Sequence, residues 1–179
     1  MRLSTLFAAA LLAPALVSAQ VAPPATANTK TLLERMQSNV SRIGPAAEKE
    51  RWNANIAMWQ VLVAKPGKLS ASDVSALQTS LETIRTNVAT IVRPAEKERW
   101  QANVRLWQMF LRGERAMMGP PGGAGSCCTQ PMMNMPGRPG VDAAFGRMTL
   151  NVAKIPDSAE KDRWQANCDL WEAVLTSQP

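Results

Sequence analysis

The 179-residue chain contains no histidine and no tyrosine. Histidine is the most frequent general base and a frequent metal ligand, and it commonly activates serine and cysteine nucleophiles. Its absence removes the usual triads. Glu48 and Glu50 are a candidate pair for acid–base chemistry, but side chains two residues apart on a helix diverge. The sequence therefore favours a protein that is not an enzyme.

Cysteine is scarce, with three residues in the chain. Since three thiols cannot all pair within one molecule, we expect one to be buried, reactive or linked to another chain. Cys127 and Cys128 are adjacent in a loop-like stretch, whereas Cys168 belongs to a helical pattern. There it takes the position that Ile56 and Val104 occupy in related segments, which favours a small buried hydrophobe.

Long apolar runs are absent beyond the N-terminus. There, the basic Arg2 precedes an apolar stretch from Leu6 to Leu16, and small residues follow up to Ala19. This order is typical of a secretory signal peptide, and the apolar part is too short to span a bilayer as a helix. We expect cleavage after Ala19 and a periplasmic or secreted mature protein without a transmembrane segment.

The chain has 20 basic and 14 acidic side chains, a formal net charge of +6. A basic exported protein can bind an anionic envelope surface through electrostatic attraction. However, the basic residues are interleaved with glutamate instead of forming one run, which is typical of solvated helix faces. Nucleic acid is therefore not an expected partner.

What the sequence does contain is one motif written three times, at residues 47–59 (AEKERWNANIAMW), 95–107 (AEKERWQANVRLW) and 159–171 (AEKDRWQANCDLW). All six tryptophans lie in these copies, in pairs seven residues apart. The pairs are Trp52 and Trp59, Trp100 and Trp107, and Trp164 and Trp171. Fixed spacing within copies and variable joins between them are typical of tandem helical units.

Apolar periodicity predicts two helices in each unit. Pro45 and Pro94 are expected in the first turns of the second and fourth helices. The third helix is expected to be capped by Ser72 or Asp73, and the sixth by Asp157 or Ser158. The predicted fold is all-α: three tandem helical hairpins, six helices, packed as a bundle or short helical array. The expected organisation is a signal peptide (1–19), a flexible lead (20–28), hairpins at 29–64, 72–118 and 141–179, and a Gly/Pro/Met-rich linker (119–140) that serves as a mobile tether for the third hairpin.

Within each copy, Glu, Trp, Asn and Trp share one helix stripe, which predicts a tryptophan core. An Asn thirteen residues before each first Trp is expected to accept its indole N–H, pairing Asn39 with Trp52, Asn87 with Trp100 and Asn151 with Trp164. The second Asn of each copy is expected to cap or bridge backbone: Asn55, Asn103 and Asn167.

Two further interpretations concern the motif surface. Glu48 and Arg51, three residues apart, are expected to pair in a solvated first turn. The alternative to a tryptophan core is an exposed ladder of indoles that binds sugars, aromatic ligands or a partner helix. Tryptophan at helical spacing is more often core, so the core interpretation is preferred.

Residues 119–140 form the one stretch with ligand chemistry. Cys127 and Cys128 are followed by Met132, Met133 and Met135, and thiolate with thioether selects Cu(I) over harder metals. Zinc is disfavoured because there is no Cys-x2-Cys pair and no histidine. A plain linker with a vicinal or interchain disulfide is the alternative.

Two functions follow. The first is an exported, non-catalytic helical-repeat module for binding or structure in an envelope-associated assembly, with another protein or a second copy as partner. The alternative is a periplasmic Cu(I)-binding protein that uses the Cys/Met-rich loop.

Overall fold

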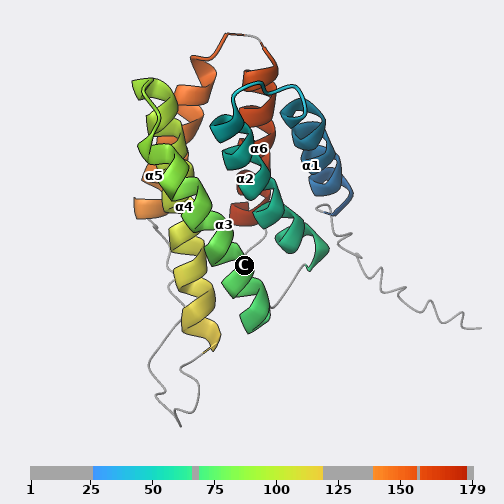
Figure 1. Cartoon of the computed structure of the whole chain (residues 1–179). Coiled ribbons are helices and arrows are strands. Elements are labelled where there is room, and N and C mark those ends of the chain that lie inside the picture. The colour runs from blue at the N-terminus through green and yellow to red at the C-terminus, as the bar shows by residue number, and fades with distance from the viewer. Residues whose placement is uncertain (1–25, 66–68, 119–138, 157, 177–179) are drawn as a thin grey trace, which may run out of the picture.

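The structure, a computed structural model, describes residues 26–65, 69–118, 139–156 and 158–176. Its elements within these ranges are helices (Figure 1): α1 (Thr26–Val40), α2 (Ala46–Ala64), α3 (Ala71–Ala89), α4 (Pro94–Met118), α5 (Pro139–Ala153) and α6 (Ala159–Thr176). They form three hairpins that pack together, which confirms the predicted all-α fold of three tandem hairpins. None of the described helices has the length and apolar character needed to cross a membrane.

Helix α3 begins at a capping box. The Ser70 hydroxyl accepts the backbone N–H of Asp73, and the Asp73 carboxylate accepts the backbone N–H of Ser70. This cap lies two to three residues before the predicted Ser72 or Asp73. Lys65, directly after α2, donates to the same carboxylate at 2.7 Å. Hydrogen bonds from Lys65 and Ser70 lower the pKa of Asp73 to about 2.

The other helix starts follow the expected chemistry with small shifts. Pro94 is the first residue of α4, whereas Pro45 is the N-cap of α2. Ser158 precedes α6, and its hydroxyl accepts the backbone N–H of Lys161. The first N–H groups of a helix have no acceptor within the helix. Proline removes one of these N–H groups, and a serine hydroxyl supplies an acceptor for one.

The six helices close into a ring. The second helix of each hairpin packs most extensively on the first helix of the next hairpin, so that α2 lies on α3, α4 on α5 and α6 on α1. Because the contact of α6 with α1 joins the last hairpin to the first, the result is a closed, pseudo-threefold bundle and not an open array. The third hairpin is an integral part of this ring, through the contacts of α5 with α4 and of α6 with α1. Its predicted tether lies outside the described residues, except for residues 139 and 140 at the start of α5.

The core lies where the three motif helices α2, α4 and α6 face one another. All six tryptophans are at most 1 % exposed. Around them pack the apolar stripes of α1, α3 and α5: Leu32, Leu33, Met36, Val40, Val74, Leu77, Leu81, Ile84, Val88, Ala144, Met148 and Val152. The tryptophans are therefore core residues, as the stripe predicted, and the exposed-ladder alternative is wrong.

Candidate functional site

The repeated motif forms a stack of layers around the pseudo-threefold axis. The first tryptophan of each copy contributes to one layer, in which Trp52, Trp100 and Trp164 form a triangle. Each pair of rings has centroids 4.9 Å apart, with interplanar angles of 65°, 68° and 66°. Edge-to-face packing of this kind places the positive edge of one ring on the negative face of the next, all the way round.

The second tryptophans form a matching triangle. Trp59, Trp107 and Trp171 have centroids 4.7 to 4.9 Å apart. Phe110, one turn further along α4, lies edge-on to Trp107 at 6.0 Å and contacts Trp171 at 6.5 Å. This end of the core therefore has a fourth aromatic ring, contributed by the second copy.

Between the two triangles lies a cyclic ring of three asparagines. Asn55 donates its Nδ2 to Oδ1 of Asn167 at 2.9 Å, and Asn167 donates to Asn103 at 3.1 Å. Asn103 closes the ring by donating to Asn55 at 3.0 Å. All three side chains are fully buried, at 0 % exposure. Each amide is thus both donor and acceptor in a network without solvent.

The indoles of the second triangle complete this network. Trp59 donates Nε1–H to Asn167 Oδ1 at 2.9 Å, Trp107 to Asn55 at 3.0 Å, and Trp171 to Asn103 at 2.9 Å. Each amide oxygen therefore accepts two hydrogen bonds, one from an amide and one from an indole, which uses both of its lone pairs.

The predicted partners of the asparagines were wrong. Asn39, Asn87 and Asn151 each donate to the backbone carbonyl four residues earlier on their own helix, and the other asparagines bond side chains instead of capping backbone. The reason is the ring closure. Since helices from three different copies meet at the axis, the groups facing one another there come from different hairpins.

The ring of three asparagines departs from threefold symmetry in the second N–H of each side-chain amide, the one that is not donated to the next asparagine. Asn55 has the sulfur of Met36 at 3.8 Å and Asn167 has the sulfur of Met148 at 3.6 Å. In the second copy, the corresponding residue on the first helix is Ile84, which is buried but has no acceptor atom. The asparagine of the second copy, Asn103, therefore lacks the weak sulfur acceptor that the other two have.

A ring of ion pairs lies at the first tryptophan layer. Arg51 pairs with Glu96 at 2.8 Å, Arg99 with Glu160 at 2.6 Å, and Arg163 with Glu48 at 3.1 Å. We call this set the Arg–Glu collar. Each pair joins one copy to the next, and the last joins the third copy back to the first.

Each collar arginine also lies over a first-layer indole of that next copy. The guanidinium carbons of Arg51, Arg99 and Arg163 are 5.8, 5.7 and 5.6 Å from the ring centroids of Trp100, Trp164 and Trp52. This distance suits a cation–π contact, which strengthens when water is excluded. Burial lowers the pKa of Arg163, against the opposing effect of the carboxylates of Glu48 and Glu160.

The predicted solvated pair of Glu48 with Arg51 was wrong, because each residue pairs across a copy boundary. The collar arginines are 5 to 6 % exposed. A signal for this was present in the sequence: the residue directly before the first tryptophan is arginine in every copy, never lysine. Arginine is the cation that stacks on aromatic rings and binds carboxylates in dry surroundings.

Cys168 lies in the core, 3 % exposed, as its alignment with Ile56 and Val104 predicted. Burial, helped by the carboxylates of Asp169 and Glu172, raises the pKa of its thiol to about 12. A thiol in this state is neutral at physiological pH and is a poor nucleophile and metal ligand.

The predicted metal ligands lie outside the described residues: Cys127, Cys128, Met132, Met133 and Met135. The predicted signal peptide, 1–19, also lies outside them. Among the residues that the structure describes, no group of three or more His, Cys, Asp or Glu side chains is placed to hold a metal ion.

Two surface grooves have the same construction in different copies. One lies between α1 and α2, with a volume of about 430 Å³, and the other between α3 and α4, with a volume of about 400 Å³. The first is lined by Gln37, Val40, Ser41, Lys49, Asn53, Ile56 and Gln60. The second is lined by Arg85, Val88, Ala89, Lys97, Gln101 and Val104. We call these the hairpin grooves.

The two hairpin grooves use equivalent positions of the repeat. Each has a valine on the first helix, a lysine from the first turn of the second helix, an amide side chain four residues on, and an apolar residue at the floor. The amides are Asn53 and Gln101, and the floor residues are Ile56 and Val104. The repeat therefore presents the same apolar, amide and cationic groups at two places on the outside of the ring.

Comparison with known proteins adds no relative. No family model, no curated protein and no solved structure matches this chain.

Proposed function

We propose that the protein is an exported, non-catalytic module for binding or structure, and that it contributes to an envelope-associated assembly through its outer surface. The observation that carries this proposal is the closed interior network. The aromatic and polar groups repeated at the axis bind one another: the tryptophans, the asparagines and the collar arginines with their glutamates. These groups hold the three copies together. Binding to another molecule is therefore left to the outer faces of the bundle.

The hairpin grooves are the candidate contact surface for another protein. In each groove an apolar floor lies beside a lysine and an amide, a mixture that suits the alternating apolar and polar side chains of a peptide segment. Because the same groups recur in two hairpins, a single partner with two equivalent segments gains effective concentration from binding both grooves. The N-terminal pattern that ends at Ala19 supports delivery of the module to the envelope.

The test combines location with site-specific crosslinking. A photo-crosslinking residue replaces Asn53 in the first groove or Gln101 in the second, and a control replaces the exposed Arg105 outside both grooves. The expected result is a chain shortened at Ala19 in the exported fraction, with the same protein adduct from both groove positions and none from the control. Retention of an uncleaved chain in the cytoplasm would refute export, and adducts no different from the control would refute the grooves.

The second candidate function is Cu(I) binding by the segment that contains Cys127 and Cys128. Its support is the chemistry of the sequence, which places Met132, Met133 and Met135 close to two adjacent thiols. The remaining cysteine, Cys168, is buried with a raised pKa, so it does not compete for the metal.

Titration of the reduced protein with Cu(I) against a chelator tests this candidate. We expect tight binding that is lost in Cys127→Ser/Cys128→Ser and kept in the control Cys168→Val. Binding that is weak, or that survives the double substitution, rules the candidate out.

A further inference from the structure

The strongest unexplained feature of the surface is Val92. It lies in the turn between α3 and α4 and is 91 % exposed, and among the described residues the other large apolar side chain left in solvent is Leu150, at 66 %. Val92 is at the tip of this turn. A fully exposed apolar side chain at a tip is suited to contact with an apolar phase.

All three hairpin turns lie at the same end of the bundle (Figure 1), so Val92 shares this end with the turns of the other hairpins. We call this end the turn face and define it as residues 41–51, 90–99, 154–156 and 158–163. Helices α2, α4 and α6 all begin there, and the partial positive charges of their N-termini point outward from the same face.

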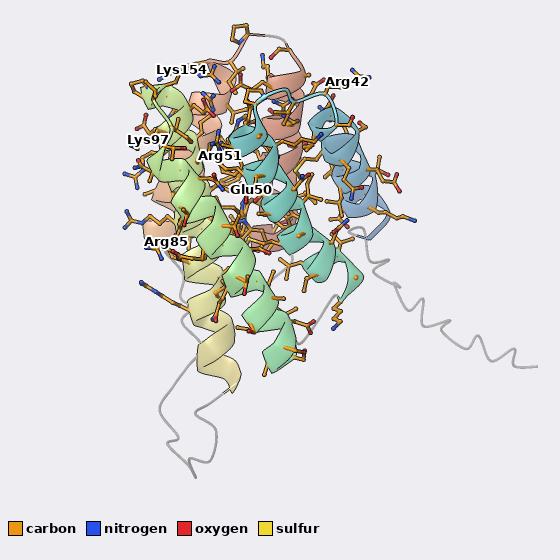
Figure 2. All side chains as sticks on the ribbon, viewed as in Figure 1. Arg42, Glu50, Arg51, Arg85, Lys97 and Lys154 are labelled. Atoms are coloured by element: carbon orange, nitrogen blue, oxygen red, sulfur yellow. The ribbon has the colours of Figure 1, made fainter. Side chains whose placement is uncertain are left out.

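The turn face carries nine basic and six acidic side chains. Arg42, Lys97 and Lys154 extend from the three different hairpins at this end (Figure 2). Arg93 directly follows Val92, and its side chain is 64 % exposed although its guanidinium contacts Glu96 at 2.8 Å. The end of the bundle that carries the apolar tip therefore also carries cations from all three hairpins.

Much of the acidic charge at this end is already neutralised. Glu48, Glu96 and Glu160 are the carboxylates of the Arg–Glu collar, each held by a buried arginine. Asp162 contacts Arg35 of α1. Glu50 and Glu98 are exposed acids that oppose the excess of exposed lysine and arginine. Because the collar also uses three of the nine basic residues, six basic and three acidic side chains of the turn face remain outside it, a positive excess toward solvent.

We propose that the turn face is a docking surface for an anionic phospholipid bilayer, with Val92 inserted among the headgroups and the surrounding lysines and arginines on lipid phosphates. This inference rests on the proposed function, because it names the lipid surface as the envelope partner of the module. Charge complementarity decides for lipid: the cations are spread over all three turns of a face that also carries one apolar tip, which matches a broad anionic plane with an apolar interior.

The test uses the purified chain that lacks residues 1–19 and vesicles of phosphatidylcholine with or without phosphatidylglycerol, read out by co-sedimentation. The charge variant is Arg42→Gln/Lys97→Gln/Lys154→Gln. Its matched control is Arg85→Gln/Arg105→Gln/Arg112→Gln, which removes the same charge from exposed positions elsewhere. Val92→Ser tests the tip, and Leu150→Ser is its control. Circular dichroism verifies that each variant is folded.

We expect binding to the anionic vesicles that falls with added salt and is weak on neutral ones. The charge variant should bind at least about tenfold more weakly than its control, since each cation near an anionic surface contributes severalfold to affinity. Val92→Ser should weaken binding severalfold, and Leu150→Ser should not.

Equal binding to neutral vesicles, or an equal loss in both triple variants, overturns the proposal. A vesicle result is independent of where the cell sends the chain. A chain that is not exported but binds anionic vesicles therefore refutes the proposed function alone, whereas an exported chain that binds none refutes the lipid surface alone.

Discussion

Trp107 donates its indole N–H to Oδ1 of Asn55 at 3.0 Å, across 52 residues of sequence and from one hairpin to the one before it. The same relationship joins the first copy to the third and the third to the second. Each copy therefore depends on a neighbouring copy for the acceptor of its buried indole. A hairpin that left the ring would leave donors unsatisfied in its neighbours as well as in itself, which favours cooperative folding of all three.

Asn55→Ala should be strongly destabilising. It removes the acceptor of two buried donors, the indole of Trp107 and the amide of Asn103. Each orphaned donor costs about 1 to 3 kcal/mol, so we expect a loss of about 2 to 6 kcal/mol in the free energy of unfolding, measured by urea denaturation. The control is Asn53→Ala on the exposed side of α2, which should change stability by less than about 0.5 kcal/mol. Equal effects for the two substitutions would contradict the buried ring.

The Arg–Glu collar should show strong coupling between copies. A double-mutant cycle on Arg51 and Glu96, whose side chains are 6 % and 8 % exposed, should give a coupling energy of about 1 to 3 kcal/mol. The control is the pair Arg85 and Glu82, which is exposed and on one helix, where about 0.5 kcal/mol or less is expected. Coupling in the collar no larger than in the control would show that the buried pairs do not hold neighbouring copies together.

Intrinsic fluorescence should show that all six indoles are shielded from water. Because every tryptophan is at most 1 % exposed, native emission should be blue-shifted and poorly quenched by acrylamide. Unfolding in guanidinium should shift emission to the red and make all six accessible in one transition, since the indoles belong to one connected core. Native emission that is already red-shifted and accessible would place the rings at the surface and remove the basis of the fold.

Cys168 should be unreactive until the protein unfolds. In Cys127→Ser/Cys128→Ser, which has one thiol, a disulfide reagent at neutral pH should react slowly with native protein and quickly in guanidinium. The folded pKa of about 12 lies above the unfolded value, so the contribution of this thiol to stability is present below about pH 8.5 and is lost as pH rises toward 12. Cys168→Val should remove this alkaline component. Rapid labelling of the native chain would disagree with a buried thiol.

The Ser70–Asp73 cap should add an acid-sensitive component to stability. The folded pKa of Asp73, about 2, lies below the unfolded value, so its contribution is present above about pH 4 and is lost as pH falls through 2. Asp73→Asn should therefore be less stable than the parent at neutral pH, and the difference should shrink between pH 4 and pH 2 in thermal melts. A difference that does not change with pH would show that the carboxylate charge is not what holds the cap.

The helices, the hairpins and the burial of the tryptophans follow from the amino-acid sequence alone. These properties depend on local spacing: an apolar stripe with helical period, prolines at helix starts, and an unbroken thirteen-residue interval from each outer asparagine to the first tryptophan of its copy. The same local alignment placed Cys168 in the core, at the position of Ile56 and Val104.

Which copies contact one another depends on the packing of the whole bundle. Sequence spacing suggested that Asn39 faces Trp52 and that Glu48 pairs with Arg51, because both inferences looked for partners within one hairpin. Closure of the ring by α6 on α1 brings equivalent helices of three hairpins to one axis, where Asn55 meets Trp107. Periodicity shows which face of a helix is buried, but the angle between successive hairpins, which is set by side-chain packing over the whole bundle, determines what that face contacts.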